Sequence, residues 1–97
     1  MGYSIEIKPL ATMDIIDAYN WYELQKEGLG LAFLSALDKF YNHLLVNPYT
    51  HSYYHKDIRH GALSKFPYTV VYQVIENSVI VYSVFMDKQN PAKKRTK

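Results

Sequence analysis

Basic and aromatic residues gather around Arg59 in the sequence, and this group is the first candidate for chemistry. His60 follows Arg59 directly, and Lys56 and Lys65 stand three residues before it and six residues after it. A guanidinium group binds phosphate through paired hydrogen bonds, and aromatic faces stack on nucleic-acid bases. The pattern indicates an RNA- or phosphate-binding surface at Arg59, His60, Lys56 and Lys65, with Tyr72 among the interleaved tyrosines. The alternative, which composition alone favours, is that the tyrosines fill a small core and Arg59 is solvated.

The familiar signatures of enzyme chemistry are missing from the sequence. It has no Gly-rich phosphate loop, no His-Glu-x-x-His and no Gly-x-Ser-x-Gly stretch. It has no cysteine, which excludes disulfides and thiolate metal sites. His51 and His55 have the i, i+4 spacing of helical metal ligands, but they fall in a segment without helical period. We therefore expect neither a metal site nor a cofactor.

Two strands that follow Arg59 in the chain would position it. From Tyr68 to Ile75 nearly every residue is aromatic or β-branched, which is typical of a half-buried strand. A second apolar run spans residues 79–85, and only the polar residues 76–78 separate the two runs. Such a short link between two strand-like runs predicts a β-hairpin.

The N-terminal half predicts one strand and two helices. Residues 3–8 alternate between apolar and polar side chains, as a strand with one solvated face does. Helical spacing follows over residues 10–26 and 31–46, and the glycines within residues 28–30 separate the two segments. The second helix has the clearest period, because its apolar residues recur every three or four positions: Phe33, Leu37, Phe40 and Leu44.

The order of elements is therefore β-α-α-β-β-β. Residues 58–63 favour a short strand before the central hairpin, and residues 47–57 have no period and are predicted to be a loop. We expect an α+β fold in which an N-terminal strand, a helical hairpin and a three-stranded antiparallel meander form one twisted antiparallel sheet with the helices on one face. The second helix should pack on these residues of the central strands or on their neighbours: Val70, Tyr72, Val74, Ile80 and Tyr82.

Length and charge indicate one domain with a distinct tail. The chain has 97 residues, 48% of them hydrophobic, which suits a single core. Residues 1–86 hold six Lys or Arg against eight Asp or Glu, hence −2, whereas residues 87–97 hold five against one, hence +4. We expect a domain over residues 1–91 and a flexible basic tail over residues 92–97. The tail is either a solvated terminus or an electrostatic attachment to nucleic acid or an acidic partner.

Signals for membranes and export are missing as well. No apolar run approaches the length of a membrane span, and the N-terminus lacks the layout of a signal peptide. The absence of cysteine fits a reducing cytoplasm. We expect a cytoplasmic protein without a membrane partner.

Several stretches, taken in order, resemble the RelE/ParE toxins of bacterial type II toxin–antitoxin pairs. They cover nearly the whole chain, and the ordered set is more specific than any single stretch. These stretches are Asn20-Trp21-Tyr22-Glu23, Gly28-Leu29-Gly30-Leu31-Ala32-Phe33-Leu34, Asn47-Pro48, Arg59, Leu63-Ser64-Lys65-Phe66-Pro67-Tyr68, Tyr72 and Gln89-Asn90-Pro91. The resemblance implies a helical hairpin on a twisted antiparallel sheet, and a cytoplasmic toxin that a cognate antitoxin holds inactive.

RelE-like members of this family cut mRNA in the ribosomal A site without a metal. The ribose 2′-OH attacks the adjacent phosphate, so the site must accept a proton, stabilise charge on the phosphate and donate to the leaving oxygen. By resemblance, Arg59 would stabilise that charge, Lys88 occupies a position that is often basic, and Tyr72 would assist proton transfer. Met86 stands where many relatives have a histidine, and a thioether cannot transfer a proton.

ParE-like members of the family instead bind DNA gyrase and are not nucleases. The resemblance therefore leaves three functions open. The leading one is mRNA cleavage, with the ribosome and mRNA as partners. The second is a non-catalytic poison of DNA gyrase, and the third is a degenerate toxin that binds only its antitoxin. In each case we expect an exposed apolar patch that the antitoxin covers.

Overall fold

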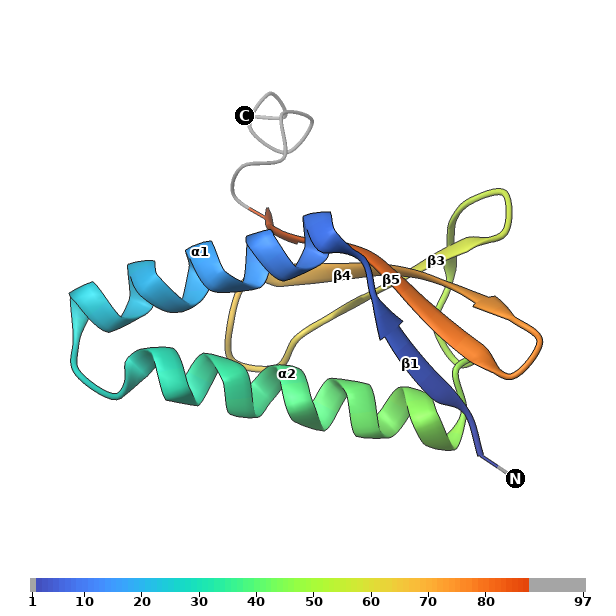
Figure 1. Cartoon of the computed structure of the whole chain (residues 1–97), viewed down its shortest axis with the longest axis horizontal. Coiled ribbons are helices and arrows are strands. Elements are labelled where there is room, and N and C mark those ends of the chain that lie inside the picture. The colour runs from blue at the N-terminus through green and yellow to red at the C-terminus, as the bar shows by residue number, and fades with distance from the viewer. Residues whose placement is uncertain (1, 88–97) are drawn as a thin grey trace.

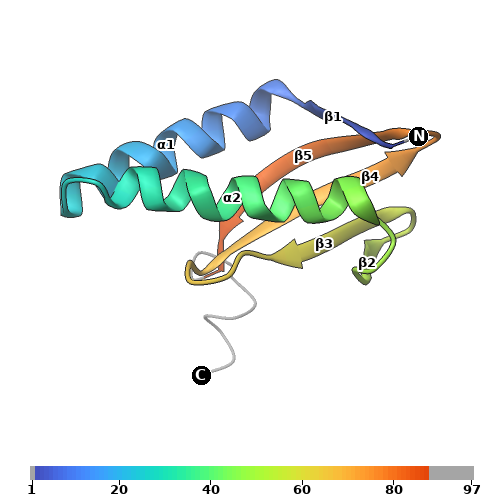
Figure 2. The ribbon, with the colours of Figure 1, turned by 90° about the horizontal axis from the view of Figure 1, so that it is seen from below.

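The computed structural model describes residues 2–87, which form one open sheet with a helical hairpin (Figure 1). The strands lie in the order β1-β5-β4-β3-β2, and the two helices lie side by side on one face of the sheet (Figure 2). This arrangement confirms the predicted α+β fold. In chain order the elements are β1 (Ser4–Ile7), α1 (Pro9–Gln25), α2 (Leu29–Val46), β2 (Tyr53–His55), β3 (Ile58–Ala62), β4 (Tyr68–Ile75) and β5 (Ser78–Met86).

The sheet contains the predicted meander and two features that were not predicted. β3, β4 and β5 pair antiparallel in chain order, as expected. β1, however, pairs with β5 in parallel, so the sheet is mixed and not wholly antiparallel. Residues 53–55, expected in a loop, form β2 on the free edge of β3. Alternation in the sequence assigns faces but not strand direction, and β2 has three exposed residues that leave no period to recognise.

Glu23 and two glycines shape the turn between the helices. Gly28 has a φ of 89°, which favours glycine, and α2 begins directly after it, two residues earlier than predicted. Gly30 lies inside α2, where a Cβ would stand 2.6 Å from Oε1 of Glu23 and 2.8 Å from the ring of Tyr19. The N–H groups of Gly28 and Gly30 donate to the two carboxylate oxygens of Glu23 at 2.9 and 2.8 Å. Glu23 thus satisfies amides at the positive end of α2.

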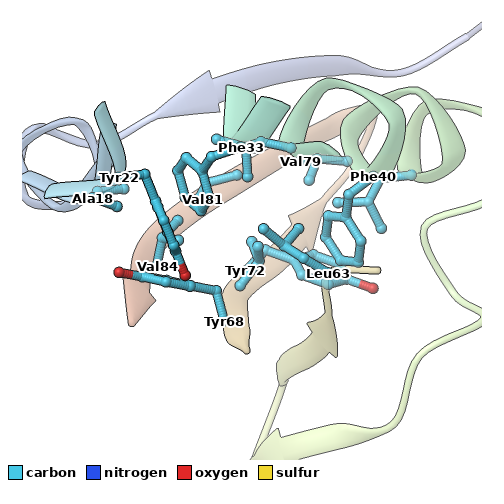
Figure 3. Packing of buried hydrophobic residues seen from close by; sticks show 14 residues of the cluster. Ala18, Tyr22, Phe33, Phe40, Leu63, Tyr68, Tyr72, Val79, Val81 and Val84 are labelled. Carbon is cyan, nitrogen blue, oxygen red and sulfur yellow. The ribbon is translucent and has the colours of Figure 1, made fainter. Parts of the chain in front are cut away.

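The core lies between the helices and the central strands (Figure 3). From β4 it contains Val70 and Tyr72, as predicted, and Val74 packs against its border. The stripe of α2 also lies where the period places it, because all four of its predicted residues are buried in this cluster: Phe33, Leu37, Phe40 and Leu44.

A bulge in β5 decides which of its residues face the helices. The core cluster contains Val79 and Val81, which are neighbours of Ile80 and Tyr82, together with Val84, whereas Ile80 is buried but lies outside the cluster. Tyr72 stands opposite Val81, but Val71 stands opposite Ser83, so Tyr82 is an extra residue between them. The extra residue moves the alternation by one position, and a regular period of two therefore fails along β5.

Candidate functional site

Arg59 lies in β3 on the sheet face that carries the helices. It stands opposite Tyr72 of β4 and Tyr53 of β2. Directly opposed residues of antiparallel strands share a face, and Tyr72 is 0% exposed within the core. Arg59 therefore approaches the rim of the core, beside the loop that joins α2 to β2.

The guanidinium group of Arg59 is bound to that loop. Its Nη1 donates to the backbone carbonyl of His51 at 2.6 Å and to that of Tyr49 at 3.3 Å, and its Nη2 donates to the hydroxyl of Tyr53 at 2.8 Å. Cζ of Arg59 also lies 4.1 Å from the ring centroid of Tyr53 and 5.3 Å from that of Tyr49, within the range of cation–π contacts. The cation predicted to bind phosphate thus binds the protein's own backbone.

Tyr72 is enclosed and bonded to the same loop. Its hydroxyl donates to the carbonyl of Pro48 at 2.8 Å, and Pro48 is itself buried. Burial raises the pKa of Tyr72 to about 12, although the charge of Arg59 opposes this change. A neutral phenol inside the core is suited to holding the loop of residues 47–52. Its hydroxyl is buried, whereas RNA would approach the protein from the solvent.

His60 points to the opposite face of the sheet from Arg59. It stands opposite Val71, one position along the ladder from the pair formed by Arg59 and Tyr72. Its ring meets that of Tyr54 edge to face at 5.5 Å between centroids. Both line a hollow of about 530 Å³ on this outer face, together with Thr69 and Asp87 among others. We call this the outer hollow.

The other predicted phosphate ligands are dispersed. Lys56 is exposed in the turn between β2 and β3, with a φ of 50°. Lys65 is exposed in the loop between β3 and β4, beyond the other end of β3 from Lys56. Lys88 lies outside the described residues, as does the predicted tail, and Met86 is the last residue of β5. The structure therefore does not gather into one site those predicted residues that lie within the described part of the chain.

His51 is a residue of this region that the sequence did not single out for a structural role. Its ring packs between Phe40, at 5.2 Å between centroids, and Tyr72, at 6.2 Å, and its buried Nε2 has no hydrogen-bond partner. Burial, followed by the charges of His43, His60 and Arg59, lowers the pKa of His51. Within residues 2–87, no group of three acidic or histidine side chains could hold a metal ion.

A second surface lies on the helical hairpin. An apolar groove of about 360 Å³ runs between α1 and α2 and is lined by Ile15, Ile16, Tyr19, Leu31 and Leu34. Ile16 and Leu31 are 49% and 61% exposed. α1 thus carries apolar side chains on both sides, although only one side packs on the sheet, and the predicted apolar patch is present. No described helix is long and apolar enough to cross a membrane.

Comparison with known proteins agrees with this fold. Residues 5–91 match the family described as the ParE toxin of the type II toxin-antitoxin system parDE. None of the curated protein sequences matches the chain.

Solved structures of two toxin groups share the architecture. A chain of the chromosomal ParDE system from P. aeruginosa superposes with a TM-score of 0.76 at 12% identity, over 87% of this chain and 95% of that chain. The isolated E. coli RelE toxin superposes with a TM-score of 0.66 at 22% identity, over 98% and 99% of the two chains. These structures support the fold, and the family match covers most of the sequence. The chain therefore belongs to the ParE toxin family of type II toxin–antitoxin systems, within the RelE/ParE group.

Proposed function

We propose that this type II toxin inhibits growth by binding DNA gyrase and that it does not cut mRNA. The observation that carries the proposal is the inward use of Arg59 and Tyr72. The hydrogen bonds of both side chains end on the loop of residues 47–52 or on Tyr53. The match to the ParE family supports the same target.

Cleavage of RNA by its own 2′-OH requires groups that can reach the ribose and the phosphate. It needs a proton acceptor, a cation for the developing charge and a donor for the leaving oxygen. Tyr72 is buried, and the guanidinium of Arg59 is occupied by carbonyl and hydroxyl oxygens. The thioether of Met86 transfers no proton. Binding to a protein target requires none of these groups.

Ribosome-dependent mRNA cleavage is the second candidate, and the outer hollow favours it. His60 lines this hollow beside Tyr54, so an imidazole and an aromatic face meet in one concave place. An imidazole is suited to proton transfer near neutral pH, and an aromatic face stacks a base. In this candidate His60 takes the chemical role that was assigned to Tyr72.

The two candidates separate in parallel assays on the purified chain. We expect the chain to inhibit supercoiling of relaxed plasmid by gyrase and to leave ribosome-bound mRNA whole. If mRNA is cut while supercoiling continues, the gyrase proposal is wrong, and loss of cutting in His60→Gln would place the chemistry in the outer hollow. Absence of both activities, with normal growth on strong expression, would leave a degenerate toxin that binds only its antitoxin.

We also propose that the cognate antitoxin covers the apolar groove between α1 and α2. An amphipathic helix is the segment that such a groove accommodates, because spaced apolar side chains fill it while polar ones remain solvated. Ile16→Asp together with Leu31→Asp should weaken antitoxin binding at least about tenfold, since each change places a charge in an apolar contact. Ile75→Asp together with Val46→Asp is the matched control, because both residues are exposed, at 47% and 81%, and neither lines the groove. Equal effects of the two changes would refute this location.

A further inference from the structure

A third hollow lies between α2 and the loop that joins β3 to β4. Its volume is about 410 Å³. On the helix side, Ser35 and Lys39 flank the short side chains of Ala36 and Ala32, which leave the space open. On the loop side, the hollow is lined by residues 64–66. Two lysines and two serines therefore surround one space, and the groups come from opposite walls.

The lysines of this hollow are available to a ligand. Lys39 and Lys65 are both exposed. The single ion pair within residues 2–87 joins Lys8 to Glu6, so no described carboxylate lies within 4 Å of either ammonium group of the hollow. Two uncompensated cations on one concave surface attract an anion and repel a cation.

Lys65 is also held in an unusual backbone conformation. Its φ is 73°, in the left-handed region that glycine adopts without steric conflict and that a lysine rarely adopts. The loop around it is anchored on both sides. The N–H of Leu63 donates to the carbonyl of Tyr68 at 3.0 Å, and the N–H of Tyr68 donates to that of Phe66 at 2.8 Å. Lys56 and Glu76 also have positive φ values, of 50° and 55°, so the conformation alone does not mark a site; Lys65 differs from them because it lines the hollow.

Phe66 fixes the position of Lys65 from within the domain. Its ring meets that of Tyr22 at 5.0 Å and that of Phe33 at 5.5 Å between centroids, so the loop is attached to both helices. The ammonium group of Lys65 is thus carried by a backbone whose position is set before any ligand arrives. Such preorganisation lowers the cost of ordering on binding.

We infer that this hollow binds a phosphate group of a nucleic-acid backbone. Lys39 and Lys65 supply charge, and the hydroxyls of Ser35 and Ser64 supply further donors from both walls. Donors on two walls of one hollow suit the tetrahedral array of acceptor oxygens on a phosphate. DNA and RNA carry the same group, and the assignment does not depend on whether gyrase is the target.

Lys65→Gly tests the link between strain and binding. The change keeps the left-handed backbone and removes the cation, so the thermal midpoint should rise while binding weakens at least about fivefold. Binding is measured by fluorescence anisotropy of a labelled DNA duplex and of a labelled single-stranded RNA, with the full-length chain. The nucleic acid that binds more tightly, the DNA duplex or the single-stranded RNA, identifies the source of the phosphate group. Unchanged affinity of Lys65→Gly in both arms would overturn the inference.

A matched pair of double variants separates a built site from diffuse charge. Lys39→Gln with Lys65→Gln removes the same net charge as Lys26→Gln with Lys56→Gln, which are exposed lysines outside the hollow. Only the first pair should make the salt dependence of binding shallower, by about one in the slope of log Kobs against log salt concentration. Equal losses in both pairs would show diffuse attraction and no site.

Inorganic phosphate provides an independent probe of the hollow. Phosphate should shift the amide resonances of residues 64 and 65 in the full-length chain, when it is compared with sodium chloride at the same ionic strength. The same resonances should not respond in the variant that lacks Lys39 and Lys65. Equal shifts in chloride and phosphate would count against the site.

Discussion

Arg59 and Tyr72 stand opposite each other across β3 and β4, and both donate hydrogen bonds to carbonyls of one loop. Arg59 binds the carbonyls of Tyr49 and His51, and Tyr72 binds that of Pro48. Two of the three residues that the family resemblance presented as catalytic thus fasten residues 47–52 to the sheet. Their substitution should change stability before it changes any activity.

Arg59→Ala should lower the free energy of unfolding by about 1–3 kcal/mol, because charge-assisted hydrogen bonds and two cation–π contacts are lost. Arg59→Lys should restore only part of this, since a lysine lacks the planar fork that reaches two carbonyls. Urea denaturation at neutral pH measures both. Lys56→Ala is the control, because Lys56 is an exposed cation three residues away. An unchanged midpoint for Arg59→Ala would contradict this structural role and would indicate that the guanidinium group is free to bind phosphate.

Tyr72→Phe should cost about 1–2 kcal/mol of stability, because the carbonyl of Pro48 loses its buried partner while the ring remains packed. Tyr54→Phe is the matched control, because the hydroxyl group that it removes belongs to an exposed side chain. Hydrogen exchange should also become faster in the loop of residues 47–52. If Tyr72 were instead a proton donor to RNA, its variant would keep its unfolding midpoint and lose cleavage.

Stability should fall as the medium becomes mildly acidic, because of His51. Burial lowers the pKa of His51 below its ordinary value of 6.5, so the unfolded chain binds the proton more readily than the folded one. The contribution of neutral His51 to the free energy of unfolding is complete above about pH 6.5. It is lost as the pH falls from there through the lower pKa that His51 has in the folded chain. Urea midpoints between pH 7.5 and 5.5 measure it. His51→Phe should flatten this dependence, whereas His55→Gln, at an exposed position, should leave it unaltered.

Glu23→Ala should destabilise the helical hairpin by about 1–3 kcal/mol, since two amides at the start of α2 lose a charged acceptor. Glu23→Gln should lie between the wild type and the alanine variant, because one amide oxygen remains. Glu27→Ala is the control, as Glu27 is exposed in the same turn. Thermal unfolding followed by circular dichroism measures the three variants, and equal midpoints for Glu23→Ala and Glu27→Ala would contradict the role of Glu23.

Local pattern was sufficient for most of the fold. The stripe of α2 faces the core because side chains spaced three and four positions apart share one side of any α-helix. The hairpin of β4 and β5 follows from two apolar runs and a short polar link. These features depend on residues that are close together in the chain. Every helix or strand places such residues in the same relative positions. The family resemblance was likewise carried by residues spread along the sequence.

Tertiary structure alone decided the faces of β5 and the role of Arg59. The bulge at Tyr82 reverses the alternation, and it is defined by pairing with β4 rather than by the residues of β5 themselves. Arg59 is held by the backbone carbonyls of Tyr49 and His51. Every residue type has a carbonyl, so nothing in the sequence marks these two as partners. Only the path of the loop brings them within hydrogen-bond distance of a guanidinium group that the sequence suggested was free.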